Sequence, residues 1–237
     1  MDGGRGGAPR ADLSQLHAVV PLRSLEGGKT RLGAALDAEE REDLIVGMLR
    51  HVLGTLLAWG GAAEVLVVSP DRALLSIASA AGARTLRQDA GDLNDAIRLG
   101  RDDVMAGGAT ALLVLPGDLP LLEREALERL REAADAALAA GGGAPLVVIV
   151  PADARSGTNA LVLSPPDVIE PAFGHDSLRA HLEAARAANA SVLLVEDPVV
   201  GFDLDTPADV ERLQPARLAE LQAIGAMPGL EAAWPAP

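Results

Sequence analysis

Residues 111–120 read Ala-Leu-Leu-Val-Leu-Pro-Gly-Asp-Leu-Pro, an apolar run followed by a turn that carries a carboxylate. The apolar run predicts a buried strand, and buried strands are typical of parallel sheets covered by helices. In an open parallel sheet, ligands bind beyond the carboxyl ends of the strands. Asp118, which follows this strand, is therefore a candidate ligand for a divalent ion; the alternative is that it caps the next helix.

On both sides of this stretch, short apolar runs alternate with longer amphipathic segments. The predicted strands are residues 17–22, 65–69, 111–115, 146–150, 160–163 and 192–195, and the predicted helices are residues 38–59, 93–105, 123–140 and 177–188. Such alternation predicts an α/β fold with a mostly parallel, doubly wound sheet and helices on both faces. Residues 146–173 hold two strands without a long helix between them, which predicts a small β-rich insertion or hairpin over the sheet edge.

The length of the chain favours a single domain, because dividing 237 residues in two would leave small cores. We expect residues 14–225 to form this domain. The Gly-rich residues 1–13 are predicted to be a disordered leader, and residues 226–237 a loose tail. Since 49% of the residues are apolar and 2% are aromatic, the core must consist mainly of Ala, Leu and Val.

Charge and composition exclude several classes of function. A formal net charge of −14 argues against nucleic acid and against an anionic membrane surface as partners, because both are polyanions. Without Cys there is no disulfide framework, thiolate zinc site or cysteine nucleophile. The chain has no signal-peptide pattern and no apolar run of about 18 residues, so we expect a cytoplasmic protein without a membrane span. The sequence does not indicate the oligomeric state.

The segment after the first predicted strand has the composition of a phosphate-binding loop. Gly27 and Gly28 allow a backbone to approach a ligand closely, and the cations Lys29 and Arg31 follow. Lys29 is the only lysine in a chain whose other basic side chains are Arg. Its compact ammonium suits a place between phosphate oxygens. The alternative is a solvated basic turn.

A second acidic motif lies far along the chain, in residues 201–209. On an extended chain Asp203 and Asp205 point to the same side, where they repel each other unless a cation lies between them. Asp209 has a structural explanation, as the third residue of a helix capped by Thr206. Together with Asp118, the pair predicts a Mg²⁺ site, since Mg²⁺ prefers oxygen ligands. A solvated acidic turn is the alternative.

Further loops add candidates for binding. Residues 155–160 and 173–177 contain Gly, and the second loop opens a predicted helix, whose free N–H groups can bind an anion or simply accept a cap. Asn94, at the start of another helix, can contact a base or ribose, or can cap the helix. The four His residues share no metal-ligand spacing, and His51 is expected to be structural.

Taken in order, these motifs resemble one known family. They are Lys29-Thr30-Arg31-Leu32, Ser69-Pro70-Asp71, Leu93-Asn94-Asp95-Ala96, Pro116-Gly117-Asp118-Leu119-Pro120, Gly157-Thr158-Asn159-Ala160, Phe173-Gly174-His175-Asp176-Ser177 and residues 203–209. The ordered set, across residues 17–212, is similar to the guanylyltransferases of deazaflavin coenzyme (F-420) biosynthesis. Members join GTP to phosphoenolpyruvate or 2-phospho-L-lactate and release pyrophosphate.

The resemblance implies a single Rossmann-like domain of the nucleotide-diphospho-sugar-transferase type, with roles for individual residues. It implies Mg²⁺ ligands at Asp118, Asp203 and Asp205, with Asp118 also counted as catalytic. Acid-substrate contacts would come from Thr158, Gly174 and Ser177. Lys29 and Arg31, also counted as catalytic, would contact the GTP phosphates, and Ser69 and Asn94 would complete the GTP site.

Phosphoenolpyruvate is the expected acceptor, which would give enolpyruvoyl-2-diphospho-5'-guanosine; 2-phospho-L-lactate and 3-phosphoglycerate are the alternatives. A molybdopterin or sugar-phosphate nucleotidyltransferase of the same fold is a further alternative. Against it, Pro21-Leu22-Arg23 intervenes where the sugar-nucleotide signature has a Gly-rich run directly after the strand. A non-catalytic GTP-binding module is the least favoured, because all three aspartates are present.

Overall fold

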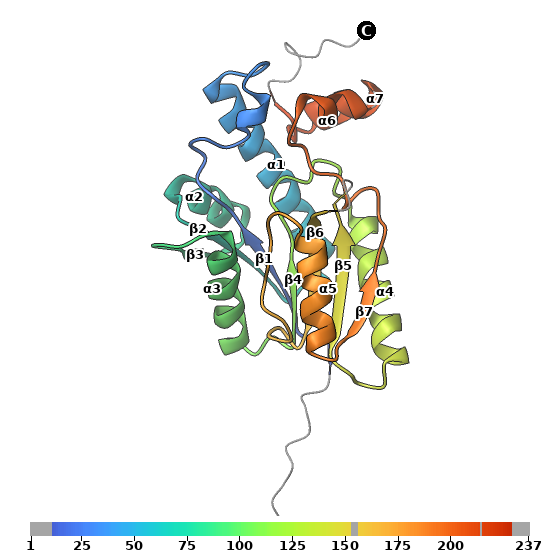
Figure 1. Cartoon of the computed structure of the whole chain (residues 1–237). Coiled ribbons are helices and arrows are strands. Elements are labelled where there is room, and N and C mark those ends of the chain that lie inside the picture. Colours follow the sequence, from blue (N-terminus) through green and yellow to red (C-terminus); the bar gives the residue numbers. More distant parts are fainter. Residues whose placement is uncertain (1–10, 153–155, 214, 229–237) are drawn as a thin grey trace, which may run out of the picture.

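A computed structural model describes residues 11–152, 156–213 and 215–228 (Figure 1). Its strands are β1 (Leu16–Pro21), β2 (Glu64–Ser69), β3 (Arg84–Arg87), β4 (Ala111–Val114), β5 (Leu146–Pro151), β6 (Thr158–Ser164) and β7 (Ser191–Leu194). Its helices are the 3₁₀ turn η1 (Thr30–Leu32) and α1 (Ala38–Trp59), α2 (Arg72–Ala81), α3 (Leu93–Ala106), α4 (Arg124–Ala140), α5 (Ser177–Ala187), α6 (Pro207–Arg212) and α7 (Pro215–Ala223). All the strands and long helices predicted from the sequence are present.

The strands form one seven-stranded sheet in the order β3-β2-β1-β4-β6-β5-β7. Strand β6 runs antiparallel to both of its neighbours, β4 and β5, and the other pairings are parallel. The predicted mostly parallel sheet is therefore confirmed. The hairpin of residues 146–164 also exists, but the expectation that it lies over the sheet edge was wrong. Its strands continue the main sheet, because Val147–Ile149 and Leu161–Leu163 are apolar on both faces and need cover on both.

Helices cover both faces of the sheet, as predicted. One core contains Ala18, Val67 and Leu113 of the sheet, packed against apolar residues of α1, α2 and α4. The other contains Val19 and Leu112, packed against α3 and α5. Neighbouring residues of a strand thus enter opposite cores, as the alternation of side chains along a strand requires.

A third apolar cluster closes the molecule at the carboxyl end of the sheet, shown at the top of Figure 1. It joins η1 and the start of α1 to α6 and α7, through residues such as Leu32, Met48, Phe202 and Leu221. The C-terminal segment docks against α1 at Gly47, where a Cβ atom would lie 2.5 Å from Cδ of Pro228. Residues 32–48 and the C-terminal segment therefore meet above the sheet.

The predicted limits of the domain need correction where residues are described. Ala226 and Met227, assigned to a loose tail, are completely buried in the third cluster. Ala11 and Leu13, assigned to the leader, are buried in the first core. Residues 1–10 and 229–237 lie outside the described residues. In the part of the chain that the structure describes, no helix combines the length and apolarity that a membrane crossing needs; cytoplasmic location stays a prediction.

Candidate active site

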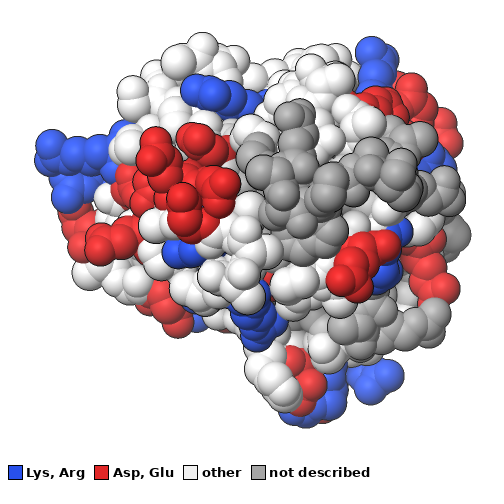
Figure 2. All heavy atoms as spheres, turned by 90° about the horizontal axis from the view of Figure 1, so that it is seen from above, with Lys and Arg blue, Asp and Glu red and all other residues white. Residues whose placement is uncertain are grey.

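An open cavity of about 850 Å³ lies beyond the carboxyl ends of β1 and β4 and beside the start of the antiparallel strand β6. It brings together eight of the residues predicted for the site: Lys29, Arg31, Asp118, Thr158, Gly174, Ser177, Asp203 and Asp205. The lining extends to the start of α6, which the third cluster holds above the sheet. Viewed from above this end, the molecule presents acidic groups with Arg side chains among them (Figure 2).

The loop after β1 is held by a carboxylate from the neighbouring strand. Asp71, which follows β2 and caps α2, accepts a hydrogen bond from the backbone N–H of Leu25 at 3.0 Å and one from the hydroxyl of Ser24 at 3.2 Å. The loop ends at Lys29, whose left-handed backbone, with φ of 49°, starts η1. The Ser69-Pro70-Asp71 motif thus shapes the loop that faces the cavity.

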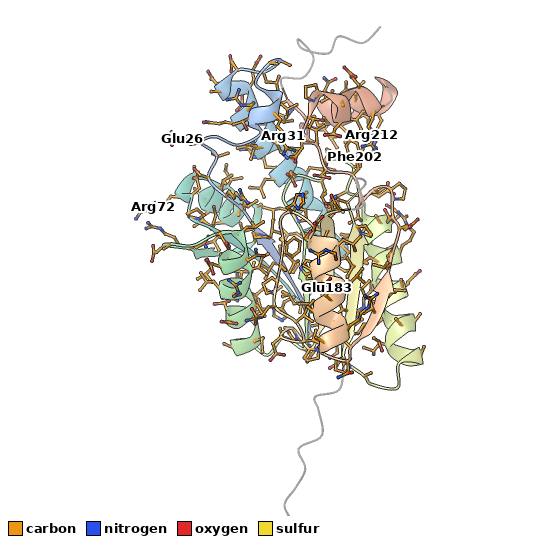
Figure 3. All side chains as sticks on the ribbon, viewed as in Figure 1. Glu26, Arg31, Arg72, Glu183, Phe202 and Arg212 are labelled. Atoms are coloured by element: carbon orange, nitrogen blue, oxygen red, sulfur yellow. The ribbon has the colours of Figure 1, made fainter. Side chains whose placement is uncertain are left out.

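Arg31 offers a cation for an anionic ligand. Its exposed side chain lines the cavity, and among the described residues it has neither an ion pair nor a hydrogen bond. Figure 3 shows Arg31 on the side of η1, with Phe202 and Arg212 on the side of α6. The guanidinium of Arg212 lies 5.2 Å from the centroid of the Phe202 ring. Positive charge therefore borders the cavity on both sides.

Lys29 reaches into the cavity between two of the predicted metal ligands. Its ammonium bonds Oδ2 of Asp118 and lies 2.6 Å from Oδ1 of Asp205, and its side chain is only 7% exposed. Burial alone would lower the pKa of Lys29, but the charges of Asp118 and Asp205 outweigh it and raise the pKa above the ordinary value. The lysine is thus held as a cation by residues 89 and 176 positions away in sequence.

Asp203 is partly buried beside the other two aspartates. Burial raises its pKa, the nearby charges of Asp118 and Asp205 add to this, and a hydrogen bond from Asn159 partly opposes it. Nδ2 of Asn159 lies 3.2 Å from Oδ1 of Asp203 and 2.9 Å from the carbonyl of Gly201. Asn159 therefore ties β6 to the acidic motif, a role that the sequence analysis missed although it placed Asn159 directly before a predicted strand.

The donor set suits a divalent cation by charge and chemistry. Three carboxylates face one cavity, and the ammonium of Lys29 bonds two of them, Asp118 and Asp205. Oxygen ligands of this kind are those that Mg²⁺ prefers. In the arrangement described, however, no three Asp, Glu, His or Cys side chains of the described residues are grouped as a metal site, and the Lys29 ammonium stands between Asp118 and Asp205. The predicted magnesium remains a prediction.

The other end of the cavity is built by β6 and the start of α5. Thr158 opens β6, and Ser177 is the first residue of α5, preceded by Gly174 with φ of 132° and Asp176 with φ of 57°. No side chain caps α5, and the first two N–H groups of the helix, those of Ser177 and Leu178, donate to the backbone carbonyls of Gly174 and Ser156. The three predicted acid-binding residues thus lie together.

Two predicted GTP contacts are placed elsewhere. Ser69 is fully buried and lies outside the cavity lining, with its hydroxyl 3.0 Å from the N–H of Asp71. Asn94 also lies outside the lining, and its amide bonds both backbone groups of Phe173, at 3.0 Å to the carbonyl and 2.7 Å from the N–H. In this structure both residues support loops, and a direct contact with GTP stays a prediction.

The comparisons with known proteins agree with this geometry. Residues 16–214 match the family model described as "Guanylyl transferase CofC like". The chain belongs to this family. It is therefore a nucleotidyltransferase, which sets aside a non-catalytic module, and the resemblance seen in its motifs is confirmed.

Relatives in the family are similar over most of their length. One from Rubrobacter xylanophilus, named phosphoenolpyruvate guanylyltransferase, is 47% identical over 197 residues, which cover 83% of this chain and 92% of the relative. One from Sphaerobacter thermophilus with the same name is 39% identical over 196 residues, which cover 83% of this chain and 91% of the relative. A solved structure from Desulfovibrio desulfuricans, described as a nucleotide-diphospho-sugar transferase, superposes with a TM-score of 0.65 at 18% identity, covering 89% of this chain and 96% of the other. That likeness confirms the predicted fold type.

Proposed function

We propose that the chain transfers a guanylyl group from GTP to phosphoenolpyruvate, giving enolpyruvoyl-2-diphospho-5'-guanosine and pyrophosphate. The observation that carries the proposal is one cavity that holds both a cationic loop and three carboxylates, in a family of guanylyltransferases. Relatives up to 47% identical are named for this reaction. Coenzyme F-420 biosynthesis is the pathway we assign to it, because the motif set resembles that pathway's enzymes.

The reaction needs positioning and charge neutralisation more than a protein nucleophile. A phosphate oxygen of the acid attacks the α-phosphorus of GTP in line, and the bond to the β-phosphate oxygen breaks as pyrophosphate leaves. Lys29 and Arg31 are suited to balance the charge that develops on pyrophosphate. In this proposal Lys29 exchanges its carboxylate partners for phosphate oxygens when GTP binds.

Mg²⁺ is part of the proposal, with Asp118, Asp203 and Asp205 as the residues that would hold it. When bound, it would offset the repulsion between the two anionic substrates. Thr158, Gly174 and Ser177, which line the other end of the cavity, would bind the acid there, with the hydroxyl of Thr158 as a hydrogen-bond donor. These assignments follow the positions of the side chains around one cavity.

A pyrophosphate-release assay tests the proposal. GTP, ATP, CTP and UTP are crossed with phosphoenolpyruvate, 2-phospho-L-lactate and 3-phosphoglycerate, with Mg²⁺ or with EDTA. We expect release with GTP, phosphoenolpyruvate and Mg²⁺ together, and little when any one is omitted. If the chain prefers 2-phospho-L-lactate, the acceptor in the proposal changes and the proposed guanylyl transfer stands. Turnover of CTP with a sugar phosphate, and none with any phospho-acid, would refute the proposal.

A further inference from the structure

His181 is a buried histidine that the reaction described above does not use, yet it joins the segments around the acid end of the cavity. It lies on α5, one turn after Ser177, and its side chain is fully buried. Nδ1 lies 3.0 Å from the hydroxyl oxygen of Thr158, and Nε2 lies 3.0 Å from the backbone nitrogen of Ala172. One ring therefore contacts β6, the loop before Gly174, and the helix of Ser177.

The bond to Ala172 determines the tautomer of the ring. A backbone N–H can only donate, so Nε2 of His181 must accept and cannot carry a hydrogen. A neutral ring then carries its hydrogen on Nδ1 and donates it to the oxygen of Thr158. Burial lowers the pKa of His181 to about 4, so the ring is neutral at pH 7.

This tautomer has a consequence for Thr158. A hydroxyl has one hydrogen to donate and lone pairs to accept with. Because the oxygen of Thr158 accepts from His181, its own hydrogen is left for another partner, and Thr158 lines the cavity. Carboxylate and phosphate oxygens can only accept hydrogen bonds, so a hydroxyl fixed as a donor suits them.

The same ring also holds the loop that leads to Gly174. Its second bond fixes Ala172, and the adjacent Phe173 packs edge-on against it, with ring centroids 5.0 Å apart. The two contacts of His181 can therefore be separated experimentally, since one concerns the donor direction of Thr158 and the other the position of the loop.

We propose that His181 is a positioning residue for the acceptor: it turns the Thr158 hydroxyl into a hydrogen-bond donor directed at an anionic oxygen of the phospho-acid. This inference rests on the proposed function and assigns no contact between His181 and substrate. A histidine that only fills the core would affect stability, or both substrates equally.

Two replacements separate the two nitrogens. In His181→Asn the amide nitrogen takes the place of Nδ1 and can still donate to Thr158. In His181→Gln the amide oxygen takes the place of Nε2 and accepts from Ala172, while the donor to Thr158 is lost. We expect His181→Gln to raise the KM for phosphoenolpyruvate about tenfold with little change in the KM for GTP. For His181→Asn, the KM for phosphoenolpyruvate and the KM for GTP should both stay closer to the wild-type values.

A double-mutant cycle with Thr158→Val tests the coupling. Thr158→Val alone should raise the KM for phosphoenolpyruvate, and adding His181→Gln should then have little further effect. If the two substitutions raise the KM for phosphoenolpyruvate independently, so that their effects multiply, the proposal is overturned. It is also overturned if His181→Gln raises the KM values for GTP and phosphoenolpyruvate equally, or raises neither. Wild-type enzyme that releases no pyrophosphate with any nucleotide and acid would instead refute the proposed function, and this inference with it.

The tautomer can also be measured on the wild-type chain, whether or not the variants fold. Long-range ¹H–¹⁵N spectra distinguish the two neutral tautomers, and substitution of each of the other three histidines in turn assigns the signals. A hydrogen on Nδ1 of His181 supports the proposal. A hydrogen on Nε2 overturns it, because Thr158 would then be the donor to the ring.

Discussion

The ammonium of Lys29 lies 2.6 Å from a carboxylate oxygen of Asp205, although the two residues are 176 positions apart. The same ammonium bonds Asp118, so the loop after β1, the turn after β4 and the segment before α6 share one charged centre. Asp203 faces the same cavity, so three carboxylates surround one buried ammonium. Replacing any one of these four side chains should therefore disturb the centre.

Replacement of Lys29 should impair turnover even when the charge is kept. In Lys29→Arg a planar fork replaces a compact ammonium in a place that leaves the side chain 7% exposed. We expect kcat to fall on the order of a hundredfold, about 3 kcal/mol, with a smaller change in the KM for GTP. Lys29→Ala should be worse on both measures. Steady-state kinetics with thermal melts measure this; wild-type kcat in Lys29→Ala would refute the role.

Asp205→Asn should remove the effect of magnesium. Mg²⁺ with GTP should raise the Tm of the wild type, since a ligand that binds only the folded state stabilises it, and the variant should lose both this rise and most turnover. Asp209→Asn is the matched control. Oδ2 of Asp209 accepts from the N–H of Thr206 at 2.7 Å as a helix cap, worth about 1 kcal/mol, so this variant should keep its response to Mg²⁺. The opposite ranking of the two variants would contradict the assignment.

Asp203→Asn should stabilise the metal-free protein at neutral pH. Burial raises the pKa of Asp203 in the folded state, so its ionisation opposes folding once the pH exceeds the ordinary value near 3.8. Asn removes that cost and can still accept the hydrogen bond of Asn159. We expect a gain of a few degrees in Tm at pH 7 that shrinks as the pH falls toward 4. A lower Tm at pH 7 would show that the carboxylate is stabilising.

Asn94→Ala should affect the acid more than the nucleotide. Its amide bonds both backbone groups of Phe173, next to Gly174, so its loss should loosen the loop of the acid end. We expect the KM for phosphoenolpyruvate to rise several-fold. In Asn94→Asp the acceptor for the N–H of Phe173 remains, and the effect should be smaller. A selective rise in the KM for GTP would instead support the nucleoside contact predicted from the resemblance.

Two glycines of α1 should respond to Ala in opposite directions. At Gly47 a new Cβ would lie 2.5 Å from Pro228 and 2.7 Å from the carbonyl of Gly225, so Gly47→Ala should displace the C-terminal segment and lower the Tm. At the exposed Gly54 no atom lies within 4 Å of a new Cβ, and Gly54→Ala should stabilise the helix by about 1 kcal/mol. A similar change in Tm for both variants would mean that the segment does not depend on Gly47.

The sequence by itself determined the mostly parallel α/β architecture and eight of the ten predicted site residues that line the cavity. Alternating apolar runs and amphipathic segments carry the periods of strand and helix, and the turn after each parallel strand, as at Asp118, must lie at the ligand-binding end of the sheet. Local sequence patterns could not decide which distant segments of the chain contact each other. The place of the 146–164 hairpin within the sheet, the burial of Ala226 and Met227, and the bonds of Asn94, Asn159 and His181 all depend on contacts between distant segments. Whether a polar side chain faces a ligand or a neighbouring backbone is decided only when those segments pack, because each buried polar group must then find a partner.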